Sequence, residues 1–179
     1  LFLTSTLYEA NKFYQTISNY TSDVVLFPMD DFLTSEALAT SPELKITRLE
    51  ALDVLCSDKK IVVTNLMGFL RFLPSKELFK NKYINLQVNQ DICFDELVKK
   101  LYEIGYTRET IINKTGEIAI RGFIIDVFPL GKQNPVRIEF WGDVIESIRE
   151  FNVDTQLTIN RINNIEIMPN TEFLVETQI

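Results

Sequence analysis

The pattern of apolar residues changes near residue 82, and this change constrains the fold more than any other feature of the 179-residue chain. Before it, short apolar segments typical of strands alternate with segments that carry apolar residues along one helical stripe. The predicted strands are 1–5, 23–28 and 60–64, and the predicted helices are 6–20, one that starts at Ser41, and 66–72. Such alternation is typical of a parallel sheet with helices on its faces.

After residue 82, one predicted helix at 94–104 is followed almost entirely by strand-like segments. The predicted strands are 109–113, 117–128, 135–141, 144–151 and 157–168. Consecutive strands joined by short polar turns predict a mainly antiparallel sheet packed against one helix. We therefore predict an α/β part over residues 1–82, followed by an α+β domain.

The residue types that the chain lacks exclude several kinds of active site. There is no histidine, which excludes Ser-His-Asp and Cys-His catalysis and every metal site that contains histidine. The six glycines form neither of the common phosphate-binding patterns. Cys56 and Cys93 match neither a zinc nor a redox spacing, and we expect both to be buried, reduced thiols. Asp30 and Asp31 are a candidate metal pair, with a solvated loop or a helix-leading charge as the alternative. We predict no catalytic residue, no cofactor and no metal.

The charge balance indicates which kind of partner the chain can bind. The chain carries 18 basic and 25 acidic residues, a net charge of −7, of which −1 lies in 1–82 and −6 in 83–179. Neither part has the positive field that supports non-specific binding to a phosphate backbone, so we predict a protein partner. No apolar stretch is long enough to span a membrane and no secretion signal is present, so we expect a cytoplasmic protein without a membrane partner. Because the chain begins at Leu1 and not at Met, we expect it to be part of a longer protein.

The most informative stretch is the predicted strand pair between residues 116 and 141, GEIAIRGFIIDVFPLGKQNPVRIEFW. Alternate residues of a strand share a face. On the first strand the apolar residues switch parity, which predicts a one-residue bulge at Gly122, where a bulge costs least. Both apolar sets then face the core: Ile118, Ile120, Phe123, Ile125 and Val127. The other face receives Glu117, Ala119 and Arg121.

The returning strand repeats the alternation. Val136, Ile138 and Phe140 are expected in the core, and Arg137, Glu139 and Trp141 outside. Arg121, Arg137 and Trp141 then lie on one face, with Glu117 and Glu139 as supporting neighbours. Arg and Trp often dominate binding energy at protein interfaces. The alternative is that Trp141 covers a domain edge and both arginines form weak surface ion pairs. The pattern leaves both open.

The same residues resemble a known family. The segment GEIAIRGFIIDVFP, followed by PVRIEFWGDVIESIREF, is similar to the UvrB-homology region of bacterial transcription-repair coupling factors (Mfd), and to the corresponding part of UvrB. Further matches are FPMDDFLTSE, SPELKITRLEAL, the turn at 105–108, and 154–156 ahead of 167–169. UvrB has a long aromatic-rich hairpin after its FP strand, whereas a short polar stretch separates Pro28 from Pro42 here. LMGFLRFLPSKELF also resembles the coupling-factor version.

This resemblance implies a partial RecA-like parallel-sheet subdomain at 1–82, a UvrA-binding domain at 83–169, and a return towards the first subdomain at 170–179. It implies that Arg121, Arg137 and Trp141 contact UvrA, with Trp141 replacing the usual Phe. It further implies a non-catalytic fragment that recruits UvrA to stalled RNA polymerase. ATP, Mg²⁺, DNA and the polymerase would be handled elsewhere in a longer protein, whose own C-terminal domain masks the UvrA face. The alternative is a UvrB-type fragment that binds UvrA and damaged DNA.

Overall fold

The computed structural model describes residues 1–31 and 41–175, so most of the polar stretch 29–41 and the end of 170–179 lie outside the described residues. The chain divides into two compact units, residues 1–74 and 75–179. This division falls eight residues before the predicted boundary near 82, which stays a prediction, as does the return of 170–179 to the first subdomain. Asn170 itself bonds within the second unit, where its backbone N–H donates to the carbonyl of Ile104 over 2.7 Å.

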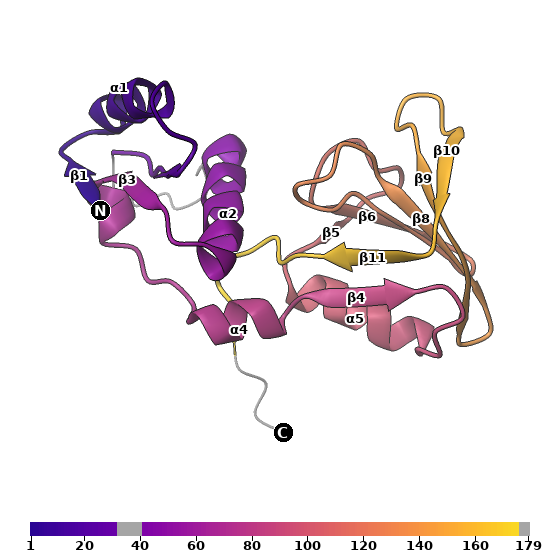
Figure 1. Cartoon of the computed structure of the whole chain (residues 1–179). Coiled ribbons are helices and arrows are strands. Elements are labelled where there is room, and N and C mark those ends of the chain that lie inside the picture. Colours follow the sequence, from indigo (N-terminus) through magenta and orange to yellow (C-terminus); the bar gives the residue numbers. More distant parts are fainter. Residues whose placement is uncertain (32–40, 176–179) are drawn as a thin grey trace. The chain divides into compact units, whose positions relative to one another are not determined.

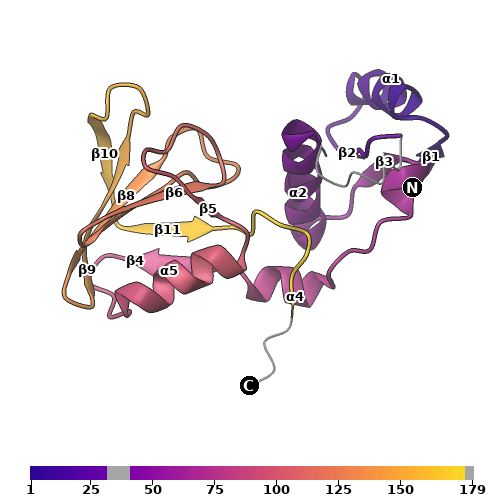
Figure 2. The same cartoon turned by 180° about the vertical axis from the view of Figure 1, so that it is seen from behind.

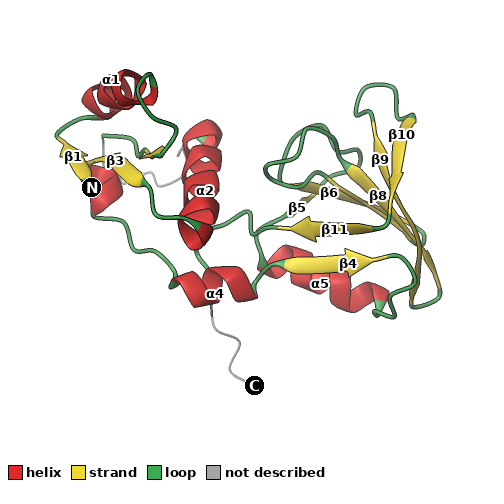
Figure 3. Cartoon of the chain, in the orientation of Figure 1, coloured by secondary structure: helices red, strands yellow, loops and turns green. Residues whose placement is uncertain are grey.

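The first unit is the α/β part that the sequence predicts (Figures 1 and 3). Its strands form a three-stranded parallel sheet in the order β1-β3-β2. The elements are β1 (Phe2–Thr4), α1 (Leu7–Ser18), β2 (Val24–Phe27), α2 (Pro42–Ser57), β3 (Ile61–Asn65) and α3 (Leu66–Phe69). Helix α1 packs Ala10 onto Val24 and Val63 of the sheet, and these three side chains centre the core of the unit. The expectation that 1–5 is a buried strand is wrong, because β1 pairs only with β3 and leaves Phe2 45% and Leu3 49% exposed.

Buried polar side chains fix the loop that follows β2. Arg48 of α2 is 1% exposed and donates to the carbonyl oxygen of Pro28 over 2.9 Å. Asp31 accepts from the backbone N–H of Leu7 over 2.7 Å, and from the side-chain amide of Asn65 over 2.8 Å. Leu7 is the first residue of α1, so Asp31 has the helix-leading role that the sequence offered as the alternative to a metal site.

The second unit holds α4 (Lys76–Asn81), one longer helix, α5 (Phe94–Glu103), and two sheets. The larger sheet has the order β10-β9-β8-β7-β6-β5 and is antiparallel except between β5 and β6. Its strands are β5 (Thr107–Arg108), β6 (Glu117–Arg121), β7 (Ile124–Val127), β8 (Val136–Trp141), β9 (Val144–Phe151) and β10 (Thr158–Ile162). The smaller sheet pairs β4 (Ile84–Gln87) with β11 (Asn164–Ile167). The two views in Figures 1 and 2 show α5 running along β4.

One apolar core joins these layers. It contains Leu97 and Leu101 of α5, residues of β4 and β11, and the alternate residues of β6 to β9 that point towards them. Tyr106 is buried in the same core, where its hydroxyl donates to the carbonyl of Met168 over 3.1 Å. We call the face of the six-stranded sheet that lies against this core the inner face, and the opposite face the outer face. The predicted α+β domain with a mainly antiparallel sheet and a helix is confirmed.

Several predicted strands are wrong in detail. Residues 109–113 form no strand, and 117–128 is a hairpin of β6 and β7. The stretch 157–168 divides into β10 and β11, which belong to different sheets. The sequence pattern missed β4 and α4, both of which are short. Cys93 is exposed at the start of α5, contrary to expectation, whereas Cys56 is buried.

Candidate functional site

The hairpin of β6 and β7 decides which residues share the outer face. Ile120 pairs with Ile125 and Arg121 with Ile124, so Gly122 and Phe123 form a two-residue turn. Gly122 has a φ of +59°, and a positive φ at the first central position is what a type II′ turn requires. The predicted bulge at Gly122 is therefore wrong. Phe123, expected in the core, is 64% exposed in this turn.

The face assignment nevertheless holds for the other residues. Ile118 lies opposite Val127 and Ile120 opposite Ile125, and all four contribute to the inner-face core. On β8 the alternation is as predicted, with Val136, Ile138 and Phe140 buried, Arg137 and Glu139 partly exposed and Trp141 exposed. The sheet does contain a bulge, at Glu146 of β9, which has no partner between the pairs Glu139–Ser147 and Phe140–Ile145.

The centre of the outer face is a carboxylate that sequence reasoning missed. Asp126 of β7 is 1% exposed and lies directly opposite Arg137 of β8. Nε and Nη2 of Arg137 donate to its two oxygens over 2.7 and 2.9 Å, and Nη2 of Arg121 donates over 2.6 Å. Two-point pairing of this kind is the strong form of a charged hydrogen bond. The signal was present in the sequence, because Asp126 alternates with the apolar residues of IIDVF and so belongs to the outer face.

Arg137 is held on more than one side. Its Nη2 also donates to Oε1 of Gln156 over 3.0 Å, and its guanidinium carbon lies 4.5 Å from the centre of the Phe151 ring. The hydrogen bonds to Asp126 raise the pKa of Arg137 above its ordinary value, because the carboxylate favours the charged form. The side chain is only 20% exposed, whereas that of Arg121 is 51% exposed. The two guanidinium groups therefore share one anion on one face, with Arg121 the more accessible.

The two acidic neighbours named from the sequence have other partners. Glu117 is 6% exposed and accepts from the backbone N–H groups of Asn113 and Lys114 over 2.8 and 3.1 Å. Glu139 accepts from the hydroxyl of Ser147 over 2.6 Å and from Nη2 of Arg149. Neither carboxylate bonds Arg121 or Arg137, so any support that they give to a binding face is indirect.

Trp141 stands apart from the ion pairs. It occupies the last position of β8, opposite Val144, and is 78% exposed. Four residues along one strand separate it from Arg137 by about 13 Å. The indole is thus an exposed apolar group at one end of a polar face, as the strand alternation predicts.

Two further observations bear on the chemistry of the molecule. Among the described residues there is no group of three or more Cys, Asp or Glu side chains placed to hold a metal ion. Across the same part of the chain, no helix has both the length and the hydropathy needed to cross a bilayer.

The comparison with protein families identifies the second unit. The family model of the UvrB interaction domain matches residues 84–173, which include the whole outer face. The chain belongs to this family. The UvrB interaction domain thus accounts for half of the sequence and ends beside the last described residues.

Individual relatives extend the similarity to the first unit. The transcription-repair-coupling factor of Bacillus subtilis is 36% identical over 179 residues, which is 98% of this chain and 15% of that protein. Those of Staphylococcus epidermidis and Staphylococcus haemolyticus are 35% and 36% identical over 100% and 98% of the chain. The chain spans only about 15–16% of the length of these relatives. The predicted resemblance to the UvrB-homology region of coupling factors is confirmed.

Proposed function

We propose that the outer face of the second unit binds UvrA, and that the chain is a non-catalytic recruiting part of a transcription-repair-coupling factor. One observation carries the proposal. Within a UvrB interaction domain, Arg121 and Arg137 donate hydrogen bonds to one buried carboxylate, that of Asp126, on the same face as the exposed Trp141. Arg137 and Trp141 share a face of β8, and the pairing of β6, β7 and β8 brings Arg121 to the same face of the sheet.

The chemistry of this face suits a protein partner. An exposed indole offers a large rigid apolar surface at a low entropic cost, which makes tryptophan a frequent anchor at interfaces. Arg121 is half exposed and keeps donors free of Asp126, because only its Nη2 is engaged there. The pair therefore offers directional hydrogen bonds, and the tryptophan offers apolar contact. Together they define both the position and the orientation of a partner.

The rest of the proposal concerns the longer protein. The relatives are named transcription-repair-coupling factors, and this chain matches a small part of them. We assign ATP and Mg²⁺, RNA polymerase and DNA to segments beyond this chain, and we assign the masking of the outer face to a C-terminal domain. The chain itself would work in the cytoplasm, in transcription-coupled nucleotide excision repair, by bringing UvrA to a stalled polymerase.

The first test removes the anchor. Trp141→Ala should weaken UvrA binding by about 2 kcal/mol, roughly thirtyfold in Kd, because an aromatic anchor that becomes buried in the complex contributes on this scale. Since the side chain is 78% exposed in the free chain, the melting temperature should stay unchanged. Titration calorimetry with purified UvrA measures the affinity. Tyr20→Ala is the control, because Tyr20 is an aromatic side chain 87% exposed in the first unit. Equal affinities for both variants would remove Trp141 from the site.

The second test addresses the arginines. The sequence alone predicts that Arg137→Ala weakens UvrA binding by about 2 kcal/mol and leaves the fold intact. The contacts of Arg137 with Asp126, Gln156 and Phe151 revise the second half of that prediction, since its loss removes two hydrogen bonds from a buried carboxylate. Arg121→Ala is the cleaner variant, because Arg121 is half exposed. A loss of UvrA affinity in Arg121→Ala at unchanged melting temperature supports the proposal, and unchanged affinity contradicts it.

The UvrB-type alternative has its own readout. A damage-binding fragment would shift damaged duplex DNA in a gel, with an affinity that falls steeply as salt increases. The proposed function expects weak or absent binding, given the net charge of −7. A phosphate-release assay, with and without DNA, should show no turnover above background for a non-catalytic fragment.

A further inference from the structure

The outer face carries a row of arginines that extends beyond the site described above. The register places Arg137 of β8 opposite Arg149 of β9, and Arg149 opposite Arg161 of β10. Residues directly opposite in an antiparallel sheet point to the same face. Three guanidinium groups therefore cross three adjacent strands, over about 10 Å from first to last.

Like charges in opposite positions destabilise a sheet unless something neutralises them. Arg137 has Asp126, and Arg149 has Glu139. The pairing of Arg149 is incomplete, because its buried Nε has no hydrogen-bond partner among the described residues. Arg149 therefore keeps one unsatisfied donor, although its charge is paired with Glu139.

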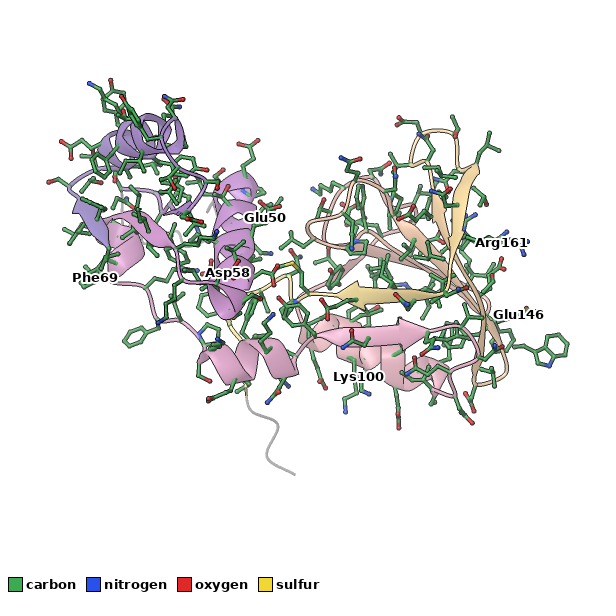
Figure 4. The ribbon with its side chains drawn as sticks, viewed as in Figure 1. Glu50, Asp58, Phe69, Lys100, Glu146 and Arg161 are labelled. Carbon is green, nitrogen blue, oxygen red and sulfur yellow. The ribbon has the colours of Figure 1, made fainter. Side chains whose placement is uncertain are left out.

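Arg161 ends the row without a partner. Its side chain is exposed and makes no hydrogen bond or ion pair with any other described residue. Figure 4 shows it extending outwards from β10. Its neighbour Asn160 has the opposite parity and bonds Glu150, so that carboxylate lies on the other face. On this edge strand nothing in the described structure neutralises Arg161.

The charge of the face contrasts with the charge of the domain. Residues 83–179 carry a net charge of −6. The strands of the outer face carry four arginines, Arg121, Arg137, Arg149 and Arg161, and their ion pairs use two carboxylates, the buried Asp126 and the partly exposed Glu139. The third carboxylate, Glu117, is buried under the 113–114 loop and bonds its backbone. An acidic domain thus concentrates unneutralised positive charge on one surface, and that surface is the one proposed to bind UvrA.

We propose that Arg161, with Arg149 beside it, extends the binding face to the β10 edge and contacts an acidic patch of the partner protein. The inference rests on the proposed function, because it takes the outer face as the docking surface. Charge complementarity identifies the occupant: a carboxylate group set opposite the end of the row neutralises Arg161 and satisfies its donors. Arg161 is then a specificity residue at the edge of the interface, whereas Trp141 is an anchor at its other end.

The test reverses the charge at the end of the row. Arg161→Glu should weaken UvrA binding about tenfold at low salt, and the difference from the unmodified chain should shrink as salt is raised, because contacts at an interface edge act through screened electrostatics. Lys100→Glu is the matched control. It makes the same change in net charge on α5, where Figure 4 labels Lys100. Leu97 and Leu101 of this helix pack into the inner-face core, so the variant should leave binding at the outer face unchanged.

The outcomes separate this inference from the function on which it rests. If Trp141→Ala weakens UvrA binding and Arg161→Glu does not, the β10 edge lies outside the interface and the inference is overturned, while the proposed function stands. If both Glu variants weaken binding equally, net charge alone is responsible and the inference again fails. If Arg161→Glu abolishes a shift of undamaged duplex DNA but leaves UvrA binding unchanged, the row serves a phosphate backbone, which also overturns it. A melting temperature equal to or above that of the unmodified chain confirms that Arg161→Glu is folded.

Discussion

The two faces of the six-stranded sheet are built from the same strands, but different forces hold them. On the inner face, Ile118, Ile125, Val136 and Ile138 are each fully buried and belong to one apolar core. On the outer face, one residue away along each strand, a buried carboxylate fixes two arginines. Burial of apolar surface is non-directional and tolerates imperfect geometry, whereas paired charges do not. The inner face therefore determines stability, and the outer face determines where particular donors point.

The largest expected effect comes from the inner face. Ile138→Ala should lower the free energy of unfolding by about 4 kcal/mol, since Ile138 is fully buried and truncation leaves a cavity. Urea denaturation measures the change. Ile159→Ala, at a position 45% exposed on β10, should cost less than about 1 kcal/mol. Similar losses for the two variants would mean that the inner face is not the main source of stability.

The second prediction compares the loss of the buried carboxylate of the outer face with the loss of its exposed arginine. Asp126→Ala should cost about 3 kcal/mol, because it removes the buried partner and leaves two guanidinium groups without their anion. Arg121→Ala removes the exposed end of the same cluster and should cost less than about 1 kcal/mol. Thermal unfolding of both variants checks the ranking. A smaller loss for Asp126→Ala than for Arg121→Ala would show that the carboxylate is not the centre of the face.

The smallest effect concerns an ionisable group within the inner core. Burial raises the pKa of the Tyr106 phenol above its ordinary value. Above pH 10 the unfolded chain releases this proton and the folded chain retains it, so the stabilisation is present below pH 10 and is lost as the pH rises towards the folded-state pKa. Tyr106 should contribute a loss of about 1.4 kcal/mol by pH 11.

Denaturation at pH 9 and pH 11, with Tyr106→Phe as the comparison, isolates this contribution. The variant lacks the ionisable hydroxyl, although it also loses the hydrogen bond to the carbonyl of Met168 and so starts less stable. Its free energy of unfolding should fall less steeply across this interval than that of the unmodified chain. Parallel slopes would mean that Tyr106 is reached by water in the folded state.

The sequence predicts which residues share a face of the sheet better than it predicts which strands pair. The parity switch at Gly122 was real, but a hairpin explains it as well as a bulge does. In this hairpin the even-numbered Ile120 pairs with the odd-numbered Ile125, and paired residues point to the same face. A hairpin and a bulge therefore both bring the two sets of apolar residues to one face. Only long-range pairing distinguishes them, and a local pattern does not contain it. The same limit explains why 157–168 was predicted as one strand, although its two halves pair with strands far apart in the sequence.

The candidate site divides in a similar way. Alternation alone places Arg121, Arg137 and Trp141 on the outer face, and the structure agrees. Their partners depended on register and could not be predicted. Glu139 was expected beside Arg137, yet it bonds Arg149 and Ser147 on the neighbouring strand. Asp126, the residue that organises the face, was read only as part of an apolar strand.

The hydrogen bonds that hold Arg121 and Arg137 on Asp126 have a thermodynamic consequence for association. A free arginine side chain samples many rotamers, and immobilising such a chain during complex formation costs about 0.5–1.5 kcal/mol. Two hydrogen bonds from Arg137 and one from Arg121 restrict these rotamers when the domain folds, before any second molecule arrives. The ordering entropy is thus lost during folding, where the inner core offsets it, and encounter begins with guanidinium groups already in place.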